Sequence, residues 1–139
     1  MIITTKERGY KGHFCGANNC LFGRNTLIKC ESISVVVSTV GVWIIDGVIA
    51  KIGLNRYYET MIFESSYDKY DDANVSHNIY IDGKTCINSP SKDIGADAMH
   101  DNAVKEVTKL IENNNLWVER YNSETGCIEE FNPTTKDKR

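Results

Sequence analysis

Residues 34–45 read SVVVSTVGVWII, and this stretch decides the fold. β-Branched residues fill positions that point to both faces of a strand, a composition typical of strands covered on both sides. We therefore predict a central strand over residues 33–45. The dipeptide Asp-Gly at positions 46–47 is a strong two-residue turn signal. Residues 48–52 are accordingly expected to pair with residues 42–45 as a hairpin.

Further strands are predicted after this hairpin. Residues 56–64 alternate between two faces, and residues 75–81 place an apolar side chain on one face at almost every second position. The Asp-Gly turn signal at 82–83 predicts that residues 84–88 return as a second hairpin. Residues 65–74 are acidic and read as an exposed loop.

One amphipathic helix is predicted near the C-terminus, over residues 96–113. Its apolar stripe recurs at three- and four-residue spacing and consists of Met99, Ala103, Val104, Val107, Leu110 and Ile111. Residues 116–121 and 127–131 are predicted to form a last hairpin or extended arm, and residues 133–139 to be frayed. The expected fold class is α+β: one domain over residues 1–139, with an antiparallel sheet of about five to seven strands packed on one helix.

The composition is typical of an ordinary globular domain. The chain has 139 residues, of which 41% are hydrophobic and 25% charged, with a net charge of −3. No apolar run is long enough to span a bilayer, and the N-terminus lacks the order of a signal peptide. The five cysteines are scattered and odd in number, which argues against a disulfide framework. We expect a cytoplasmic protein with no membrane partner.

The charges are unevenly distributed along the chain. Residues 1–56 hold seven Lys and Arg against three Asp and Glu, a balance of +4, whereas the remainder holds nine against sixteen, a balance of −7. An anionic ligand would therefore meet the first portion more readily. Neither G-x-G-x-x-G nor G-x4-G-K-[ST] occurs, so a phosphate cradle would need arginine side chains and loop amides.

Arginine forks bind phosphate through two parallel hydrogen bonds, and tyrosine rings can stack on a base. These requirements select a candidate ligand-binding set, Arg24, Asn25, Arg56, Tyr57 and Tyr58. The competing interpretation is structural. Tyr57 and Tyr58 are consecutive strand residues, so one of the two is expected in the core.

Cysteine and histidine chemistry is the alternative. His13, Cys15 and Cys20, with Cys30 as a fourth ligand, form the most metal-like cluster, but the paired C-x2-C knuckles of zinc sites are absent. Packed cysteines are the favoured interpretation, so we expect no metal and no cofactor. His77 and His100 are interpreted as structural histidines. The acidic stretch at 68–72 could imitate nucleic-acid phosphates, although a solvated loop is the simpler account.

Six short segments carry a resemblance to a known family: GHF at 12–14, CLFxRNTL at 20–27, VSTVG at 37–41, IG at 52–53, RYYETM at 56–61 and MH at 99–100. Over about residues 6–112 the chain resembles an uncharacterised family of small proteins encoded by phages, plasmids and bacterial genomes. The region from residue 116 onward departs from that family. The resemblance implies no activity by itself.

A mobile-element setting favours a counter-defence protein, and such proteins are often oligomeric. The leading expectation is a non-enzymatic protein that binds and sequesters an anionic nucleotide immune signal. A homo-oligomer is among the expected assemblies. The first alternative is an anti-CRISPR-type inhibitor that binds a host effector protein through an acidic surface. The second is an enzyme that uses His13 with Cys15 or Cys20, with or without zinc.

Overall fold

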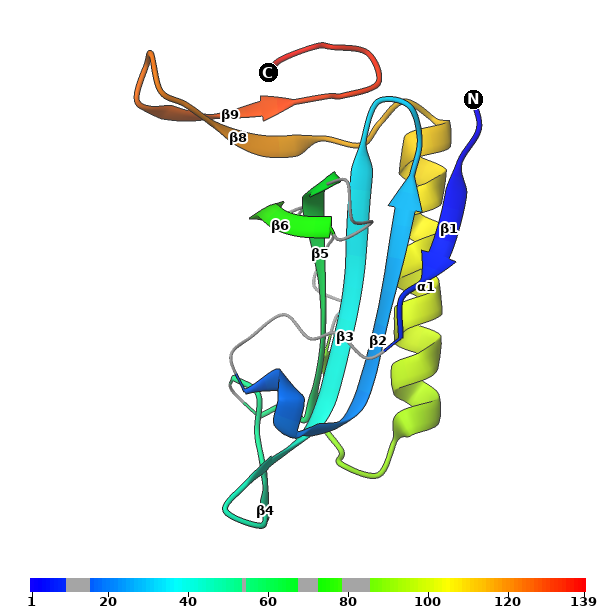
Figure 1. The fold of residues 1–139 in the computed structure, drawn as a ribbon, viewed down its shortest axis with the longest axis vertical. Coiled ribbons are helices and arrows are strands. Elements are labelled where there is room, and N and C mark those ends of the chain that lie inside the picture. Colours follow the sequence, from blue (N-terminus) through cyan, green and yellow to red (C-terminus); the bar gives the residue numbers. More distant parts are fainter. Residues whose placement is uncertain (10–15, 54, 68–72, 79–85) are drawn as a thin grey trace.

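A computed structural model describes residues 1–9, 16–53, 55–67, 73–78 and 86–139 of the chain (Figure 1). These residues form a seven-stranded antiparallel sheet, one long helix and a separate two-stranded sheet, so the predicted α+β class is confirmed. The elements in chain order are β1 (Thr4–Glu7), the 3-10 turn η1 (Ala17–Asn19), β2 (Cys20–Lys29), β3 (Ser34–Ile45), β4 (Val48–Ala50), β5 (Tyr58–Tyr67), β6 (Ala73–Asn78), β7 (Cys86–Ile87), α1 (Asp93–Glu112), β8 (Val118–Asn122) and β9 (Cys127–Phe131).

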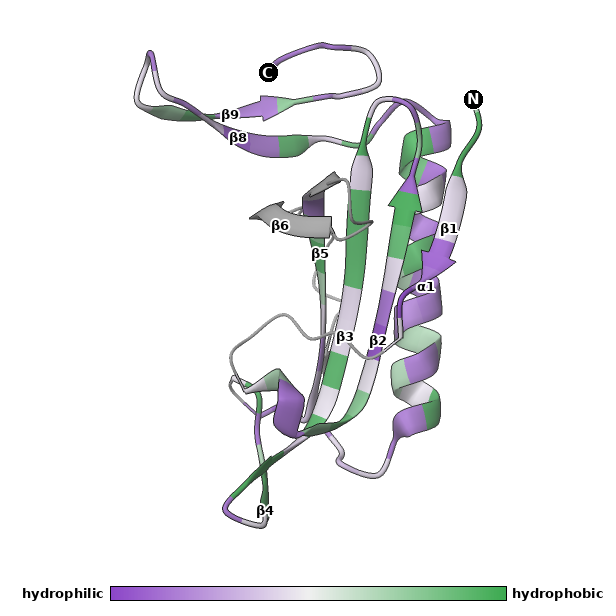
Figure 2. Ribbon diagram, viewed as in Figure 1, coloured by the Kyte–Doolittle hydropathy of each residue, from purple (hydrophilic) through white to green (hydrophobic). Residues whose placement is uncertain are grey.

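β3 lies at the centre of the main sheet, as predicted. The strand order is β1-β2-β3-β5-β6, with β4 paired to the end of β3 and β7 to the start of β5. Every residue from position 35 to 42 is buried, and Figure 2 shows apolar residues along much of this strand. The predicted hairpin is also confirmed, because Ile45 pairs with Val48 across Asp46 and Gly47. Both turn residues have positive φ angles, 51° and 77°, as a tight two-residue hairpin turn requires.

Helix α1 packs on one face of the sheet, so the predicted position of the helix is confirmed; it begins at Asp93, three residues earlier than expected. Its buried apolar residues join side chains of β2, β3 and β5 in the main hydrophobic core. This core contains Ile28, Cys30, Ile33, Val35, Val37, Ile62, Ala103, Val107, Ile111, Leu116 and Val118. Within the described part of the chain, no helix is both long and apolar enough to cross a membrane.

The strand register assigns polar residues to the two faces of the sheet. Arg24, Thr39 and Thr60 are aligned across β2, β3 and β5. The next aligned set is Asn25, Ser38 and Met61. Because consecutive strand residues point to opposite faces, the first set faces α1 and the second faces away from it.

The C-terminal region closes one end of the core. Leu116 and Val118 are each 1% exposed and belong to the main core, and β8 pairs with β9 as the predicted last hairpin. The residues expected to fray instead fold back, because Asn132 is buried and its amide side chain accepts hydrogen bonds from the residues at 134–135. Figure 1 shows both termini at this end of the molecule, opposite the end where β4 lies.

Two boundaries differ from the predictions. β5 continues to Tyr67 and β6 begins at Ala73, so the described residues of the predicted loop, 65–67 and 73–74, lie in strands, and they pair across a register shift after Glu64. The predicted second hairpin is wrong for the described residues: β6 pairs with the end of β5, and the return segment β7 pairs with the start of β5, where Ile87 lies opposite Tyr58. The turn signal at 82–83 itself lies outside the described residues.

Candidate functional site

Arg24, the first predicted phosphate ligand, is surrounded by carboxylates. Its Nη1 lies 2.8 Å from Oδ1 of Asp101 and 3.3 Å from Oδ1 of Asp97, and its Nε lies 3.2 Å from Oε1 of Glu7. Burial alone would lower the pKa of Arg24, but the hydrogen bonds and negative charges of Glu7 and Asp101 raise it. Three anions already surround this one cation, so the site repels a further anion.

Arg56 stabilises the loop that begins at Ile52, and its charged group is already paired. Its Nε donates to the backbone oxygen of Ile52 at 2.8 Å, and its Nη2 forms an ion pair with Glu59. The guanidinium also lies against Gly53, where a Cβ atom would come within 2.6 Å of Nη2. Gly53 has a φ angle of 69°, so glycine suits this position in both conformation and space.

The two tyrosines have separate roles. Lys51 lies over the Tyr57 ring, with Nζ 5.9 Å from the centroid. Tyr58 is fully buried: its ring packs edge-on against Phe22, with centroids 5.7 Å apart, and its hydroxyl donates to Asp93. Burial raises the pKa of Tyr58, and the hydrogen bond and charge of Asp93 raise it further. A buried ring cannot stack on a base, so Tyr58 is the core member of the pair.

The five predicted ligand residues therefore do not converge on one pocket. Arg24 and Asn25 are consecutive on β2 and point to opposite faces of the sheet. Arg56 and Tyr57 lie in the segment before β5, and Tyr58 faces the helix. Asn25 lies beside a cation that has a buried donor without a partner among the described residues.

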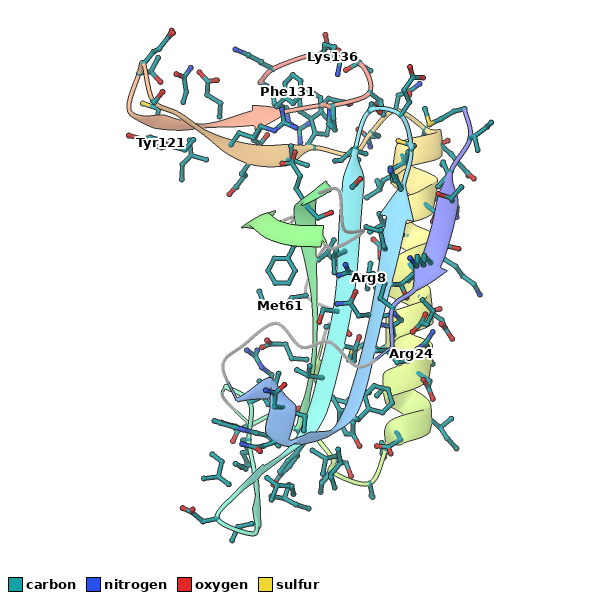
Figure 3. All side chains as sticks on the ribbon, in the orientation of Figure 1. Arg8, Arg24, Met61, Tyr121, Phe131 and Lys136 are labelled. Atoms are coloured by element: carbon teal, nitrogen blue, oxygen red, sulfur yellow. The ribbon has the colours of Figure 1, made fainter. Side chains whose placement is uncertain are left out.

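That cation is Arg8, which directly follows β1 and lies against Asn25. The Arg8 amide donates to the Asn25 backbone oxygen at 2.7 Å, and its Nε donates to Oδ1 of Asn25 at 2.9 Å. Nη1 of Arg8 is buried and has no hydrogen-bond partner among the described residues. In Figure 3, Arg8 and Met61 lie in front of the sheet, and α1 lies behind it.

A buried guanidinium donor without an acceptor is energetically unfavourable, because it has lost water and gained nothing in return. An anion that supplied an oxygen to Nη1 would remove that penalty and form a charge-assisted hydrogen bond. Asn25 is 3% exposed, so the position is shielded from water, where such a bond is stronger. The Arg8–Asn25 pair is therefore the candidate anion site.

A second polar cluster lies on the helix side of the sheet and is centred on His100. The ring is fully buried, with Nε2 2.7 Å from Oγ1 of Thr26 and Nδ1 2.7 Å from Oγ1 of Thr39. Thr26 in turn donates to Oε2 of Glu7 at 2.8 Å, and Oγ1 of Thr39 lies 2.5 Å from Oγ1 of Thr60. The structural interpretation of His100 is consistent with this burial. We call this set of five residues the His100 chain.

The surroundings of the His100 chain favour a neutral imidazole and an ionised carboxylate, although the negative charges of Glu7, Asp101 and Asp97 act in the opposite direction on the pKa of His100. Burial lowers the pKa of His100, and the positive charge of Arg24 lowers it further. For Glu7, burial opposes ionisation, but hydrogen bonds from Arg24 and Thr26 prevail and lower its pKa.

The cysteine hypothesis finds little support among the described residues. Burial raises the pKa of the Cys20 thiol to about 11, so the thiolate needed for nucleophilic attack is scarce at neutral pH. In the portions of the chain that the structure describes, no group of three His, Cys, Asp or Glu could hold a metal ion. His13 and Cys15, and the acidic stretch at 68–72, lie outside the described residues.

Sequence reasoning missed Arg8. The residue stands in a charged tripeptide, Lys6-Glu7-Arg8, that resembles an exposed terminal segment. Its contact with Asn25 spans 17 positions and depends on how β1 pairs with β2. No local sequence pattern predicts the register in which β1 pairs with β2.

Comparisons with known proteins identify no relative: no protein-family model, no curated protein and no solved structure matches the chain.

Proposed function

We propose that the protein is a non-enzymatic binding protein that sequesters an anionic nucleotide immune signal, with Arg8 and Asn25 as its anchoring residues. The observation that carries this proposal is the buried Nη1 of Arg8, which has no hydrogen-bond partner in the part of the chain that the structure describes. Natural proteins satisfy nearly all buried polar groups, so an unsatisfied one calls for an explanation, and an anionic ligand supplies one for this cation. Arg24 has a structural role in this proposal, because its charge is already neutralised by carboxylates.

The class of ligand follows from the chemistry at the anchor. A guanidinium with a free donor suits a phosphate oxygen, and an amide side chain suits a base edge or a ribose hydroxyl. The counter-defence setting rests on the resemblance to proteins of phages and plasmids. Sequestration needs affinity and no reaction, which suits a site built from one cation and neutral polar groups.

Mass spectrometry after unfolding the purified protein tests whether a nucleotide is carried from the host. Calorimetric titration with cyclic and linear nucleotide messengers then compares wild type with Arg8→Met, which keeps an unbranched apolar stem. Loss of a charge-assisted hydrogen bond costs roughly 1.5–3 kcal/mol, so binding should weaken about 10- to 100-fold. The matched control is Arg139→Met, which removes an exposed arginine that is paired with Glu130 and should leave affinity unchanged.

The stability of the ligand-free variant separates binding from folding. Arg8→Met removes an Nη1 that has no partner among the described residues, but it also removes the hydrogen bond from Nε to Asn25, so the free energy of unfolding should fall by about 1–3 kcal/mol. The proposal fails if no messenger is carried or bound by wild type, or if Arg8→Met binds as tightly as wild type.

A protein target is the second candidate, and exposed apolar residues favour it. Leu21 and Ile94 are 74% and 88% exposed and line a cavity of about 490 Å³ together with Val42. Neighbouring exposed aliphatic side chains of this kind are typical of protein contacts. If a host effector binds here, Leu21→Ser with Ile94→Ser should abolish inhibition of that effector, whereas Arg8→Met should leave it intact. If Arg8→Met abolishes inhibition and the two serines do not, the nucleotide-binding proposal is supported instead.

A further inference from the structure

The end of β1 connects the two polar clusters. Glu7 and Arg8 are consecutive residues; Glu7 bonds to Thr26 and Arg24 on the helix side, and Arg8 bonds to Asn25 on the other side. β1 is a four-residue edge strand whose residues are all exposed, so little apolar packing fixes it. Beside the backbone pairing of β1 with β2, the side chain of Glu7 is therefore a principal anchor of the backbone that presents Arg8.

The hydrogen atoms of the His100 chain have one self-consistent arrangement. The Glu7 carboxylate only accepts, so the Thr26 hydroxyl gives it its single hydrogen. Thr26 can then only accept from the ring, which assigns the imidazole hydrogen to Nε2 of His100. A neutral ring accepts at Nδ1, so Thr39 donates there.

The remaining link follows the same logic. Because the hydroxyl hydrogen of Thr39 is used, Thr60 donates to Thr39. Every hydrogen bond in the chain thus points toward Glu7. A chain of hydrogen bonds with one direction polarises each member and strengthens the last bond, here the one that holds the carboxylate.

The charged groups that face His100 come from three elements. Glu7 of β1, Arg24 of β2, and Asp97 and Asp101 of α1 contribute charge, whereas β3 and β5 contribute only the hydroxyls of the chain. Both ring nitrogens bond to threonine, and no carboxylate of the described residues bonds to the ring. The ring therefore links Thr39 to Thr26 by hydrogen bonds and takes part in no ion pair with the described residues.

From this geometry we propose that Glu7 is the positioning residue for Arg8, and that His100, as the Nε2–H tautomer, holds Glu7 in place through Thr26. This role of Glu7 rests on the proposed function of Arg8 in ligand binding. In the ligand-free protein, Glu7 should already hold Arg8 in position. Thr26 and His100 lie on the helix side, away from the Arg8 side chain, and act on Arg8 through Glu7 and the backbone of β1.

Amide hydrogen exchange at Arg8 tests the positioning directly, without any ligand. Thr26→Val keeps the shape of the side chain and removes the hydroxyl, so the bond from the Arg8 amide to Asn25 should open more often and exchange about 10-fold faster. Thr26→Ser restores the hydroxyl and should exchange within about threefold of wild type. Thr5→Val is the matched control, because it lies on the same strand outside the chain and should change nothing.

A second measurement needs no variant. Nitrogen-15 chemical shifts of the His100 ring distinguish its tautomers, and the Nε2–H form is expected at pH 7.5. An Nδ1–H ring would overturn the inference, as would an Arg8 amide that exchanges equally in Thr26→Val and wild type.

Ligand titration completes the test. With a messenger that wild type binds, Thr26→Val should bind about 5- to 20-fold more weakly and Thr26→Ser normally. Equal affinity for wild type and Thr26→Val would overturn the inference while leaving the proposed function intact. If wild type binds no messenger, the proposed function fails, and the exchange and tautomer measurements still decide whether Glu7 positions Arg8.

Discussion

Arg8 and Arg24 have the same side chain but opposite surroundings. Arg24 contacts three carboxylates, whereas Arg8 contacts the neutral amide of Asn25 and buries a donor that no described residue pairs. The sequence indicates arginine as the useful residue type, since both lie in the basic first portion. It could not indicate which arginine, because Asp97 and Asp101 reach Arg24 only after α1 has packed on the sheet.

Acid should destabilise the protein through His100. Because its pKa is lower in the folded state than the ordinary 6.5, the unfolded chain binds the proton more readily. The stabilising effect of the neutral ring is thus complete above about pH 6.5 and is lost as pH falls through and below that value. Urea unfolding at pH 7.5, 6.5 and 5.5 should show this decline, with a slope of at most about 1.4 kcal/mol per pH unit.

Proton NMR can follow the ionisation of the His100 ring separately from unfolding. The signal of a carbon-bound ring proton should titrate with a midpoint below pH 6.5. Replacement of His100 by Gln should flatten the pH dependence of unfolding between pH 7.5 and 5.5. A midpoint above 6.5 would contradict the prediction, because protonation would then stabilise the fold.

Among the elements, the helix and the β3–β4 hairpin could be predicted because each carries its own signal. The apolar stripe of α1 and the Asp-Gly turn are local patterns that need no knowledge of distant contacts. β5 was predicted to end three residues early, because its last residues are polar and pair only through β6 across a register shift. The end of β5 depends on its pairing with β6, which the periodicity of the β5 sequence does not predict.

The β8–β9 hairpin is joined to β5 by an ion pair between Arg120 and Glu64, whose side chain is only 11% exposed. Glu64→Gln should lower the free energy of unfolding by about 1–2 kcal/mol, because the charge-assisted bond is lost while Arg120 remains partly accessible to water. Glu130→Gln is the matched control: its pair with Arg139 is exposed and should contribute less than about 0.5 kcal/mol. Thermal unfolding measures both, and equal losses would contradict the prediction.

The whole molecule should unfold as one unit, because α1 and the C-terminal region share the main core. Leu116→Ala with Val118→Ala removes buried side chains and should cost about 3–6 kcal/mol. The control is Tyr121→Ala with Ile128→Ala, an exposed pair on the same hairpin that should cost less than about 1 kcal/mol.

Two tryptophans report on this cooperativity from different ends of the molecule. Trp117 precedes β8, and Trp43 lies near the paired end of β3 and β4. In a Trp117→Phe background, the fluorescence of Trp43 should show the full loss of stability caused by the two alanines at 116 and 118. A Trp43 transition that stays at its original urea concentration would show that the two ends unfold separately.

The shared location of the two termini has a practical consequence for immobilised assays. A biotin or affinity tag on either end attaches the protein to a sensor surface by the β8–β9 end (Figure 1). The opposite end, with the β3–β4 turn, then projects into the flowing solution whichever terminus is tethered. Two chips prepared with opposite tags should therefore report the same kinetics for an analyte that binds at the projecting end, and a difference between them would locate the analyte close to the tethered one.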